Sequence, residues 1–179
     1  MKKSFFLPIL LALLALFNAC NSNNTDDVWK VANTNAYDAI TKNRDYQQLL
    51  TETGPSGVYY KVIQSGTGTE HPIQTSSVKV LYKGYFYDGT VFDSGSSQNG
   101  IPQEIGVNGV LYYGTALPRG LSFALQNMVV GDKWEIWIPY YLAYGTSGLI
   151  DSSSYQTIIK GYTTLVYEVE LVSITQYPQ

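Results

Sequence analysis

The distribution of apolar residues divides the chain into a helical part followed by a β-rich part. In the second part, apolar and polar side chains alternate with a period of two residues, as they do on strands with one buried face. Four runs show this alternation: Val58 to Gln64, Val78 to Lys83, Lys133 to Pro139 and Thr164 to Ile174. An Asp88-Gly89 pair after the second run predicts a tight turn into a short strand over 90–93. The sequence therefore predicts an antiparallel sheet of about five strands.

Two segments show helical spacing instead. The first is an N-terminal helical segment over 28–57, which Asp26-Asp27 would cap and which the run from Gly54 to Gly57 would break. Its apolar positions are Trp29, Ala32, Ala36, Ile40 and Leu50. The second begins at Pro118, which suits the first turn of a helix, and ends before Gly131. Its apolar face consists of Leu117, Leu121, Leu125 and Met128.

These elements predict an α+β domain over 58–179, in which one short helix covers the apolar face of the sheet. Sixteen tyrosines and sixteen glycines, beside two methionines, are typical of half-buried strands joined by glycine turns. A chain of 179 residues supports one core of ordinary size and leaves little room for a second domain. The stretch 140–163 follows neither period, and a long loop inside a compact domain is more often functional than accidental.

The first residues have the pattern of a secretory leader. Lys2 and Lys3 are followed by an apolar run from Phe5 to Phe17, which is shorter than a membrane-spanning helix requires. The residues from Leu16 to Cys20 resemble a bacterial lipobox, in which cleavage precedes an acylated cysteine. We therefore expect a signal peptide over 1–19, a lipid on Cys20 and a polar tether over 20–27. The alternative is an ordinary secretory signal with an incidental cysteine.

Charge and ligand-forming residues exclude several classes of function. The formal charge is −3, and removal of a leader that carries Lys2 and Lys3 lowers it by two, to −5. Such a surface repels phosphate backbones, so no nucleic-acid partner is expected. Cys20 and His71 are the single cysteine and the single histidine of the sequence. No disulfide within the chain, no zinc site and no cofactor is therefore expected.

Several motifs occur in an order that resembles the FKBP family of peptidyl-prolyl isomerases. They are Val78 to Gly84, Asp88 to Ser94, Gly120-Leu121 with Leu125 and Met128, Gly131 to Trp134, Ile138-Pro139, Leu142 to Gly145, and Leu165 to Leu171. Each motif alone is common, but the ordered set covers about 58–174 and agrees with the strands and the helix expected from periodicity. The resemblance implies a sheet curled around one short helix, and isomerisation of X-Pro peptide bonds without a covalent step.

The resemblance also implies the residues of the site. Tyr144 is expected to donate a hydrogen bond to the substrate carbonyl, and Asp93 to place a carboxylate near the twisting amide. The pocket would be lined by Tyr82, Phe92, Ile101, Leu117, Leu121, Ile159 and Tyr167. A purely structural interpretation is open for each residue. The aromatic residues could be ordinary core, Asp93 could close a turn, and Tyr144 could hold a loop in place.

The sequence departs from the family pattern at several places, and two of these departures bear directly on activity. Pro118 falls at or next to the position whose backbone N–H usually binds the substrate carbonyl, and proline has no N–H. The loop 149–161 is longer than in the family and could reshape the mouth of the pocket. These departures leave open a second hypothesis, that the chain is a catalytically weak or inactive FKBP-like lipoprotein acting as a chaperone or a subunit of an envelope complex.

A hydrolase is a third hypothesis and a weak one. His71 with Asp93 and either Ser76 or Ser94 supplies the residue types of a catalytic triad, but the sequence contains no Gly-x-Ser-x-Gly elbow. The preferred hypothesis is an isomerase acting on proline-containing polypeptides in the cell envelope, anchored to the outer membrane and facing either the periplasm or the exterior. The N-terminal helix would then space the domain from the membrane or contribute to dimerisation.

Overall fold

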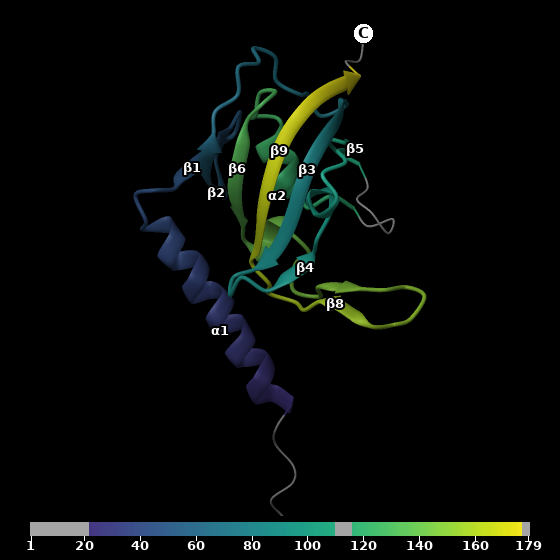
Figure 1. Ribbon diagram of the computed structural model, residues 1–179. Helices are drawn as coiled ribbons and strands as arrows, with labels where there is room; N and C mark the ends of the chain where they lie inside the picture. The colour runs from purple at the N-terminus through teal and green to yellow at the C-terminus, as the bar shows by residue number, and fades with distance from the viewer. Residues whose placement is uncertain (1–21, 110–115, 177–179) are drawn as a thin grey trace, which may run out of the picture.

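A curved antiparallel sheet wraps around one short helix in this computed structural model, which describes residues 22–109 and 116–176 (Figure 1). The strand order is β1-β2-β6-β9-β3-β4, and β5 also pairs with β3, beside the pairing of β3 with β4. The seven strands are β1 (Gln47–Thr51), β2 (Gly54–Gln64), β3 (Ser77–Phe86), β4 (Val91–Asp93), β5 (Gln103–Gly106), β6 (Lys133–Ile138) and β9 (Leu165–Gln176). The sheet thus has seven strands where the sequence predicted about five.

The helices and the remaining strands lie outside this sheet. The α-helices are α1 (Ser22–Thr41) and α2 (Arg119–Leu125), and short 3-10 turns occur at η1 (Ser96–Gln98) and η3 (Tyr140–Leu142). A separate two-stranded sheet pairs β7 (Leu149–Ile150) with β8 (Thr157–Ile159). In the described part of the chain, no helix is both long and apolar enough to cross a membrane.

The predicted alternation is confirmed on the strands that form the core. On β3, Val78, Val80 and Tyr82 are buried, while the residues between them are more exposed. On β6, Trp134, Ile136 and Ile138 are buried, while Glu135 and Trp137 are on the other face. Strand β9 pairs with both β3 and β6 along its length. The three strands therefore present one continuous apolar face toward α2.

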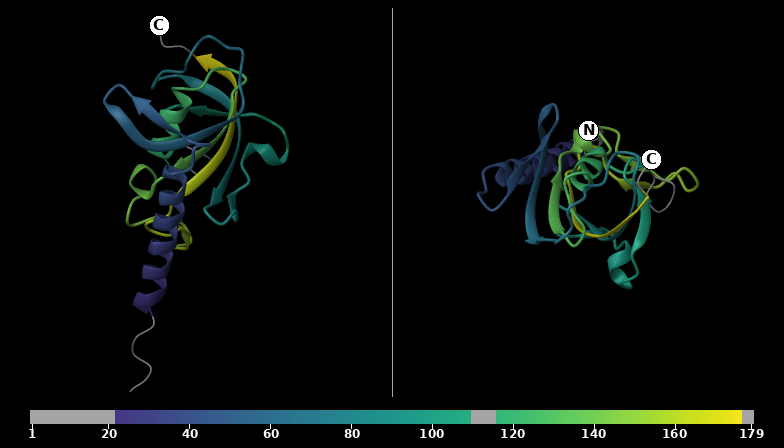
Figure 2. Two further views of the ribbon diagram at one scale, coloured as in Figure 1. Left: turned by 90° about the vertical axis from the view of Figure 1, so that its left-hand side faces the viewer. Right: turned by 90° about the horizontal axis from the view of Figure 1, so that it is seen from above.

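Helix α2 covers the concave face of the sheet, and the strands curve around it when the molecule is seen from above (Figure 2). Leu121, Leu125 and Met128 are each at most 2% exposed, as their spacing predicted. Gly120 allows close contact, because a Cβ atom there would lie 2.5 Å from Cγ2 of Ile138. The carbonyl of Pro118, the residue before α2, accepts hydrogen bonds from the backbone N–H groups of Leu121 and Ser122. The helix is short but firmly placed.

Helix α1 is docked on one end of the sheet rather than separated from it (Figure 1). The indole N–H of Trp29 donates to Oγ1 of Thr163 at 3.0 Å, and the Trp29 ring packs edge-on against Phe86. Asn33 is fully buried, and its Oδ1 accepts the backbone N–H of Thr164 at 2.8 Å. Farther along α1, the hydroxyl of Tyr37 donates to the carbonyl of Gly57. These bonds make α1 an integral part of the folded unit.

The boundaries of the N-terminal part differ from those expected. Helix α1 begins at Ser22, so residues 22–27, which were expected to form a tether, are helical and Asp26-Asp27 lie within the helix. The helix ends at Thr41, and Leu50, which matched its spacing, belongs to β1. Residues 54–57, expected to break a helix, start β2. The predicted leader over 1–19 and Cys20 lie outside the described residues.

Candidate active site

Three aromatic rings from neighbouring strands meet inside the curve of the sheet. Tyr82 lies on β3, Phe92 on β4 and Tyr167 on β9, and the pairing of β3 with both other strands brings them together. The edge of one ring meets the face of the other in the Phe92–Tyr167 pair, at 5.7 Å and 88°. The Tyr82 and Tyr167 ring centroids are 6.4 Å apart. Tyr82 and Tyr167 are at most 1% exposed, and Phe92 is half-buried.

Asp93 is held by two hydrogen bonds at the edge of this cluster. Its Oδ2 accepts the hydroxyl of Tyr82 at 3.2 Å, and its Oδ1 accepts the backbone N–H of Gly95 at 2.9 Å. Gly95 has φ +49°, and a Cβ atom there would lie 2.3 Å from the carbonyl oxygen of Tyr82. Glycine is therefore required for this turn. The two bonds fix the position of the carboxylate at the edge of the aromatic cluster.

Tyr144 reaches the site from the segment that follows η3. Its ring is half-buried and packs against the hydrophobic core. Its hydroxyl donates to the carbonyl of Ala116, just before α2, with an oxygen–oxygen distance of 3.4 Å. This distance is long for an O–H···O bond, so the contact is weak. Through this contact Tyr144 connects the long loop to the residues just before α2.

The hydroxyl of Tyr167 is enclosed close to that of Tyr144. The residue is fully buried, and its oxygen makes no hydrogen bond of ordinary geometry among the described residues. Burial raises the pKa of Tyr167 well above its ordinary value, and the neighbouring Tyr144, Asp93 and Tyr82 raise the pKa further. Tyr167 therefore remains protonated at neutral pH, with an O–H group that faces the other polar groups of the site.

Aliphatic side chains complete the cluster, with one exception. Leu117 and Leu121 come from the start of α2, and Ile159 comes from β8; all are less than 9% exposed and belong to the same core. Ile101, which was also expected to line the pocket, is 66% exposed and lies outside this core. Its segment follows η1 and is directed by a bond from its N–H to Oδ1 of Asn99. The structure therefore brings together the expected residues other than Ile101.

Pro118, the residue before α2, supplies no backbone N–H between Leu117 and Arg119. The residue is buried and has φ −53° and ψ 132°. Its ring nitrogen has no proton, and its carbonyl is occupied by the first bonds of α2. The phenols of Tyr82, Tyr144 and Tyr167 are the side-chain hydroxyls of the cluster, and that of Tyr82 donates to Asp93.

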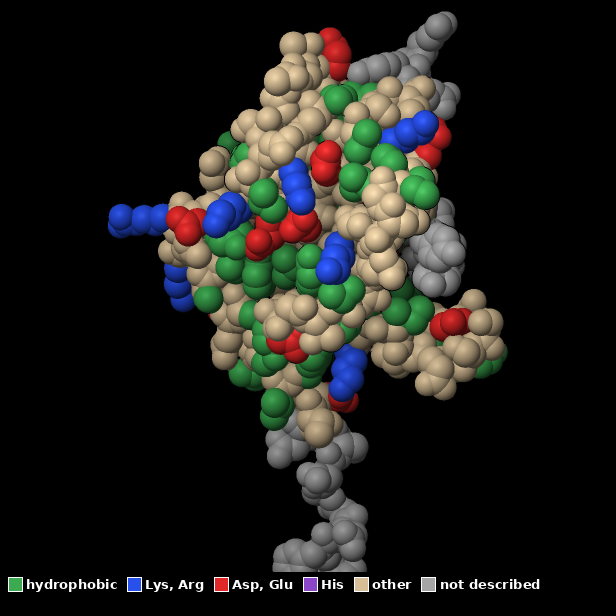
Figure 3. Space-filling view, viewed as in Figure 1, with side chains coloured by type: hydrophobic (Ala, Val, Ile, Leu, Met, Phe, Trp, Pro, Cys, Tyr) green, Lys and Arg blue, Asp and Glu red, His purple; other side chains and the backbone are tan. Residues whose placement is uncertain are grey.

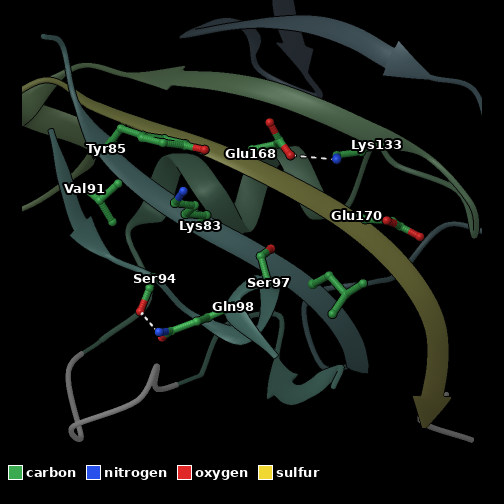
Figure 4. A pocket seen from close by; sticks show the side chains of 10 residues that line it. Lys83, Tyr85, Val91, Ser94, Ser97, Gln98, Lys133, Glu168 and Glu170 are labelled. Atoms are coloured by element: carbon green, nitrogen blue, oxygen red, sulfur yellow. Dashed lines mark hydrogen bonds and ion pairs between the residues drawn. The ribbon is translucent and has the colours of Figure 1, made fainter. Parts of the chain in front are cut away.

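A separate cleft of about 580 Å³ lies on the opposite, outer face of the sheet (Figure 4). Its walls are Leu81, Lys83, Tyr85, Val91, Ser94, Ser97, Gln98, Lys133, Glu168 and Glu170. The β3 residues among these alternate with Val80, Tyr82 and Gly84, so their side chains point away from the aromatic cluster. Lys133 and Glu168 form an ion pair at 2.7 Å, and charges of both signs lie among hydrophobic side chains over this face (Figure 3). The cleft is distinct from the aromatic site.

Two residues that support the aromatic cluster, Gly84 and Phe86, were not identified from the sequence as part of the site. A Cβ atom on Gly84 would lie 2.6 Å from Cζ of Phe92, so the absence of a side chain there makes room for the ring. A glycine within an alternating strand signals such a close approach. Phe86 packs on Phe92 with ring centroids 5.1 Å apart and joins it to Trp29 of α1. The signal that could have identified Phe86 is its place on the same strand as Tyr82.

A sheet curled around a short helix, with an aromatic cluster beside a hydrogen-bonded carboxylate and a phenol, is compatible with a domain that binds or isomerises a substrate without covalent chemistry. Comparison with known families identifies it further. Residues 68–172 match the family model described as FKBP-type peptidyl-prolyl cis-trans isomerase. The chain belongs to this family.

Named relatives agree with this assignment. The FKBP-type 22 kDa peptidyl-prolyl cis-trans isomerase of Escherichia coli K12 is 44% identical over 119 residues, which are 66% of this chain and 50% of that protein. The outer membrane protein MIP of Legionella longbeachae is 37% identical over 120 residues, which are 67% of this chain and 45% of that protein. The chain thus spans about half the length of the curated relatives it matches.

Solved structures show the same fold over a larger part of the chain. The crystal structure of a peptidyl-prolyl cis-trans isomerase from Pseudomonas syringae pv. tomato has a TM-score of 0.66 and 29% identity, and covers 84% of this chain and 96% of its own. The crystal structure of FkpA from Escherichia coli has a TM-score of 0.66 and 28% identity, and covers 87% of this chain and 63% of its own. The predicted α+β fold and the family resemblance are confirmed.

Proposed function

We propose that this protein is an active isomerase of X-Pro peptide bonds that assists the folding of proline-containing polypeptides. The observation that supports this most strongly is the convergence of Tyr82, Phe92 and Tyr167 beside the bonded carboxylate of Asp93. The Escherichia coli relative that is 44% identical over 119 residues is named a peptidyl-prolyl cis-trans isomerase. The hydrolase hypothesis lacks comparable support, because Nδ1 of His71 contacts the backbone carbonyl of Met128 rather than a serine.

The aromatic cluster would accelerate rotation by favouring the twisted amide over the planar one. The planar amide is stabilised by resonance and hydration, and its rotation barrier is about 18–20 kcal/mol. A dry ring-lined surface receives the apolar prolyl ring and removes water that stabilises the planar state. Each ~1.4 kcal/mol of preference for the twisted state increases the rate tenfold. No proton transfer or covalent intermediate is needed.

Tyr144 and Asp93 would supply the polar part of this preference. The Tyr144 hydroxyl can exchange its long bond to the Ala116 carbonyl for a shorter bond to the substrate carbonyl. Asp93 would place a fixed negative charge near the carbonyl carbon, which becomes more electropositive when resonance is lost. Because the bonds from Tyr82 and Gly95 already hold the carboxylate, little reorganisation is required when the amide twists.

An isomerisation assay on the chain from Ser22 tests the proposal. A short peptide with an Ala-Pro bond is transferred from a solvent that enriches the cis form, and recovery of the trans form is followed with increasing protein. We expect the rate constant to rise in proportion to protein concentration. A rate equal to the uncatalysed one, together with suppressed aggregation of an unfolded protein, would instead establish the chaperone function without turnover.

We further propose that the protein is a lipoprotein of the outer membrane, anchored through acylated Cys20. The sequence supports this through its positive start, its short apolar run and the lipobox-like residues before Cys20. One relative is named an outer membrane protein. Metabolic labelling with a fatty acid, followed by mass spectrometry of the N-terminal peptide, tests the anchor. We expect label on wild type and none on Cys20→Ser, and label on neither would refute lipidation.

A further inference from the structure

A row of four aromatic rings connects helix α1 to the candidate site. Trp29 on α1 meets Phe86 edge-on, with ring centroids 5.7 Å apart and planes at 85°. Phe86 lies 5.1 Å from Phe92, and Phe92 lies 5.7 Å from Tyr167 in a second edge-on pair. Offset and edge-on contacts of this kind are favourable arrangements of aromatic rings. Trp29 is therefore the outer end of an aromatic row (Trp29, Phe86, Phe92, Tyr167) that ends inside the site.

The Trp29 ring is held by contacts other than its contact with Phe86. Its indole N–H donates to Oγ1 of Thr163 at 3.0 Å, and this hydroxyl donates in turn to the carbonyl of Lys160 at 2.7 Å. The Lys160 ammonium lies 5.6 Å from the centroid of the indole. The Trp29 carbonyl accepts the side-chain amide of Asn33, whose Oδ1 binds the backbone N–H of Thr164. These bonds fix the indole, so that it provides Phe86 with a surface of defined position.

Phe92 is the ring of the site that most needs such support. It lies on the three-residue strand β4 at the end of the sheet order, and the position beneath it is Gly84, which has no side chain to hold it. Its ring contacts come from Tyr167, which is fully buried in the core, and from Phe86, which is only half-buried. Phe86 is thus the less constrained of the two supports, and Trp29 packs on it.

We propose that Trp29 is a positioning residue for the isomerisation, which fixes Phe86 and thereby keeps the Phe92 ring in place against the prolyl substrate. This inference rests on the proposed isomerase function and extends the catalytic unit to a helix outside residues 68–172, which match the family model. Phe92 is half-buried, so part of its ring is open to a bound chain. Small displacements of a contact surface are enough to weaken preference for the twisted amide.

Substitutions of Trp29 in the isomerisation assay test this role. Trp29→Leu removes the edge-on contact, and we expect kcat/KM to fall roughly three- to tenfold under conditions in which denaturant titration shows the variant to be folded. Trp29→Phe keeps a ring against Phe86 and loses only the indole N–H, so it should recover most of the activity. In a Phe86→Leu background, adding Trp29→Leu should change kcat/KM by less than about twofold, because Trp29 acts through Phe86.

Tyr37→Phe is the matched control on the same helix. Tyr37 lies about two turns beyond Trp29, and its hydroxyl donates to the carbonyl of Gly57. The variant should lower the free energy of unfolding and keep wild-type kcat/KM. The ring signals of Phe92 in aromatic NMR spectra should shift in Trp29→Leu and stay in place in Tyr37→Phe.

Each contrary result has a separate meaning. Wild-type kcat/KM in Trp29→Leu would overturn the positioning role and leave the isomerase function standing. An equal loss in Tyr37→Phe, or no recovery in Trp29→Phe, would overturn it in favour of general docking of α1. Independent losses from Trp29→Leu and Phe86→Leu would show that Trp29 does not act through Phe86. A wild-type protein without activity would overturn both proposals.

Discussion

Gly84 lies directly beneath the ring of Phe92, and a Cβ atom at this position would be 2.6 Å from the ring carbon Cζ. The backbone of β3 is thereby part of the pocket wall, because it allows Phe92 to lie against the strand and meet Tyr167. The position of the Phe92 ring in the aromatic cluster thus depends on the absence of a side chain at Gly84.

Replacement of this glycine should damage the site more than the fold. Gly84→Ala forces the Phe92 ring away from β3, and overpacking of this kind costs about 1–3 kcal/mol. We expect a lower free energy of unfolding by denaturant titration and a larger loss in kcat/KM than stability alone explains. Gly89→Ala is the control in a turn where nothing lies within 4 Å of the added Cβ, although its φ of +85° makes some loss of stability expected there too. Full activity in Gly84→Ala would contradict the role of the Phe92 ring.

Removal of the Asp93 carboxylate should slow turnover without unfolding the domain. Asp93→Ala takes away the acceptor for the Tyr82 hydroxyl and for the Gly95 N–H, as well as the charge itself. We expect kcat/KM to fall at least tenfold, and the near-ultraviolet circular dichroism of the aromatic cluster to be largely retained. Asp151→Ala, at an exposed turn on the β7–β8 hairpin, should keep its activity. Equal rates in wild type and Asp93→Ala would show that the carboxylate only closes a turn.

Tyr144→Phe tests the hydroxyl that is proposed to donate to the substrate carbonyl. The change removes the hydroxyl, with its weak bond to the Ala116 carbonyl, and keeps the ring in the core, so we expect the melting temperature to change by only a few degrees. We expect a fall in kcat/KM of about tenfold or more. An unchanged rate would assign Tyr144 to holding the loop in place.

Helix α1 should stabilise the end of the sheet that carries Thr163 and Thr164. Asn33→Ala leaves the buried N–H of Thr164 without its acceptor, which costs about 1–3 kcal/mol. We expect faster hydrogen exchange over 160–165 and a lower free energy of unfolding. Thr34→Ala, one position along on the exposed face, removes only a bond to the Lys30 carbonyl and is the matched control. Identical exchange in both variants would mean that α1 is dispensable.

Alkaline pH should weaken the contact between β6 and the segment before β1. Burial and the hydrogen bond to Glu135 raise the pKa of Tyr46 from 10.0 to about 12. The unfolded state therefore loses its proton first, so the stabilisation is fully present below pH 10 and is lost between pH 10 and about 12. Tyr46→Phe should flatten the fall in unfolding free energy over this range. Tyr155→Phe, at an 84% exposed ring, should follow the wild-type curve.

Long alternating runs predicted most of the sheet, because each such run has one buried face. β3, β6 and β9 all lie where the pattern indicated. Periodicity gave a wrong prediction where a residue matched the spacing by chance, and it gave no prediction where a strand was very short. Leu50 matched the helical spacing of α1 by coincidence and belongs to β1. β7 and β8 contain two and three residues, too few to reveal a period, so the hairpin in the long loop was not expected.

The part of the candidate site that could be predicted was the set of residues that belong to motifs in the order found in the family. The motifs indicated Tyr82, Asp93 and Tyr144, and the structure places their side chains around the same core. Exposure of Ile101 was not predictable, because its segment is directed by a local bond to Asn99 rather than by periodicity. The enclosed hydroxyl of Tyr167 was also hidden, since an aromatic residue on an alternating strand indicates only burial.

With the proposed lipid on Cys20, the docking of α1 would set how far the domain can lie from the bilayer. Asn21 alone separates the proposed lipid site at Cys20 from the first residue of α1, and a helix of 20 residues is about 30 Å long. Because Trp29 and Asn33 bind this helix to the sheet, the helix and the domain would move together as one rigid body. An isomerase mounted in this way would act on polypeptides in a thin layer beside the membrane rather than throughout the compartment.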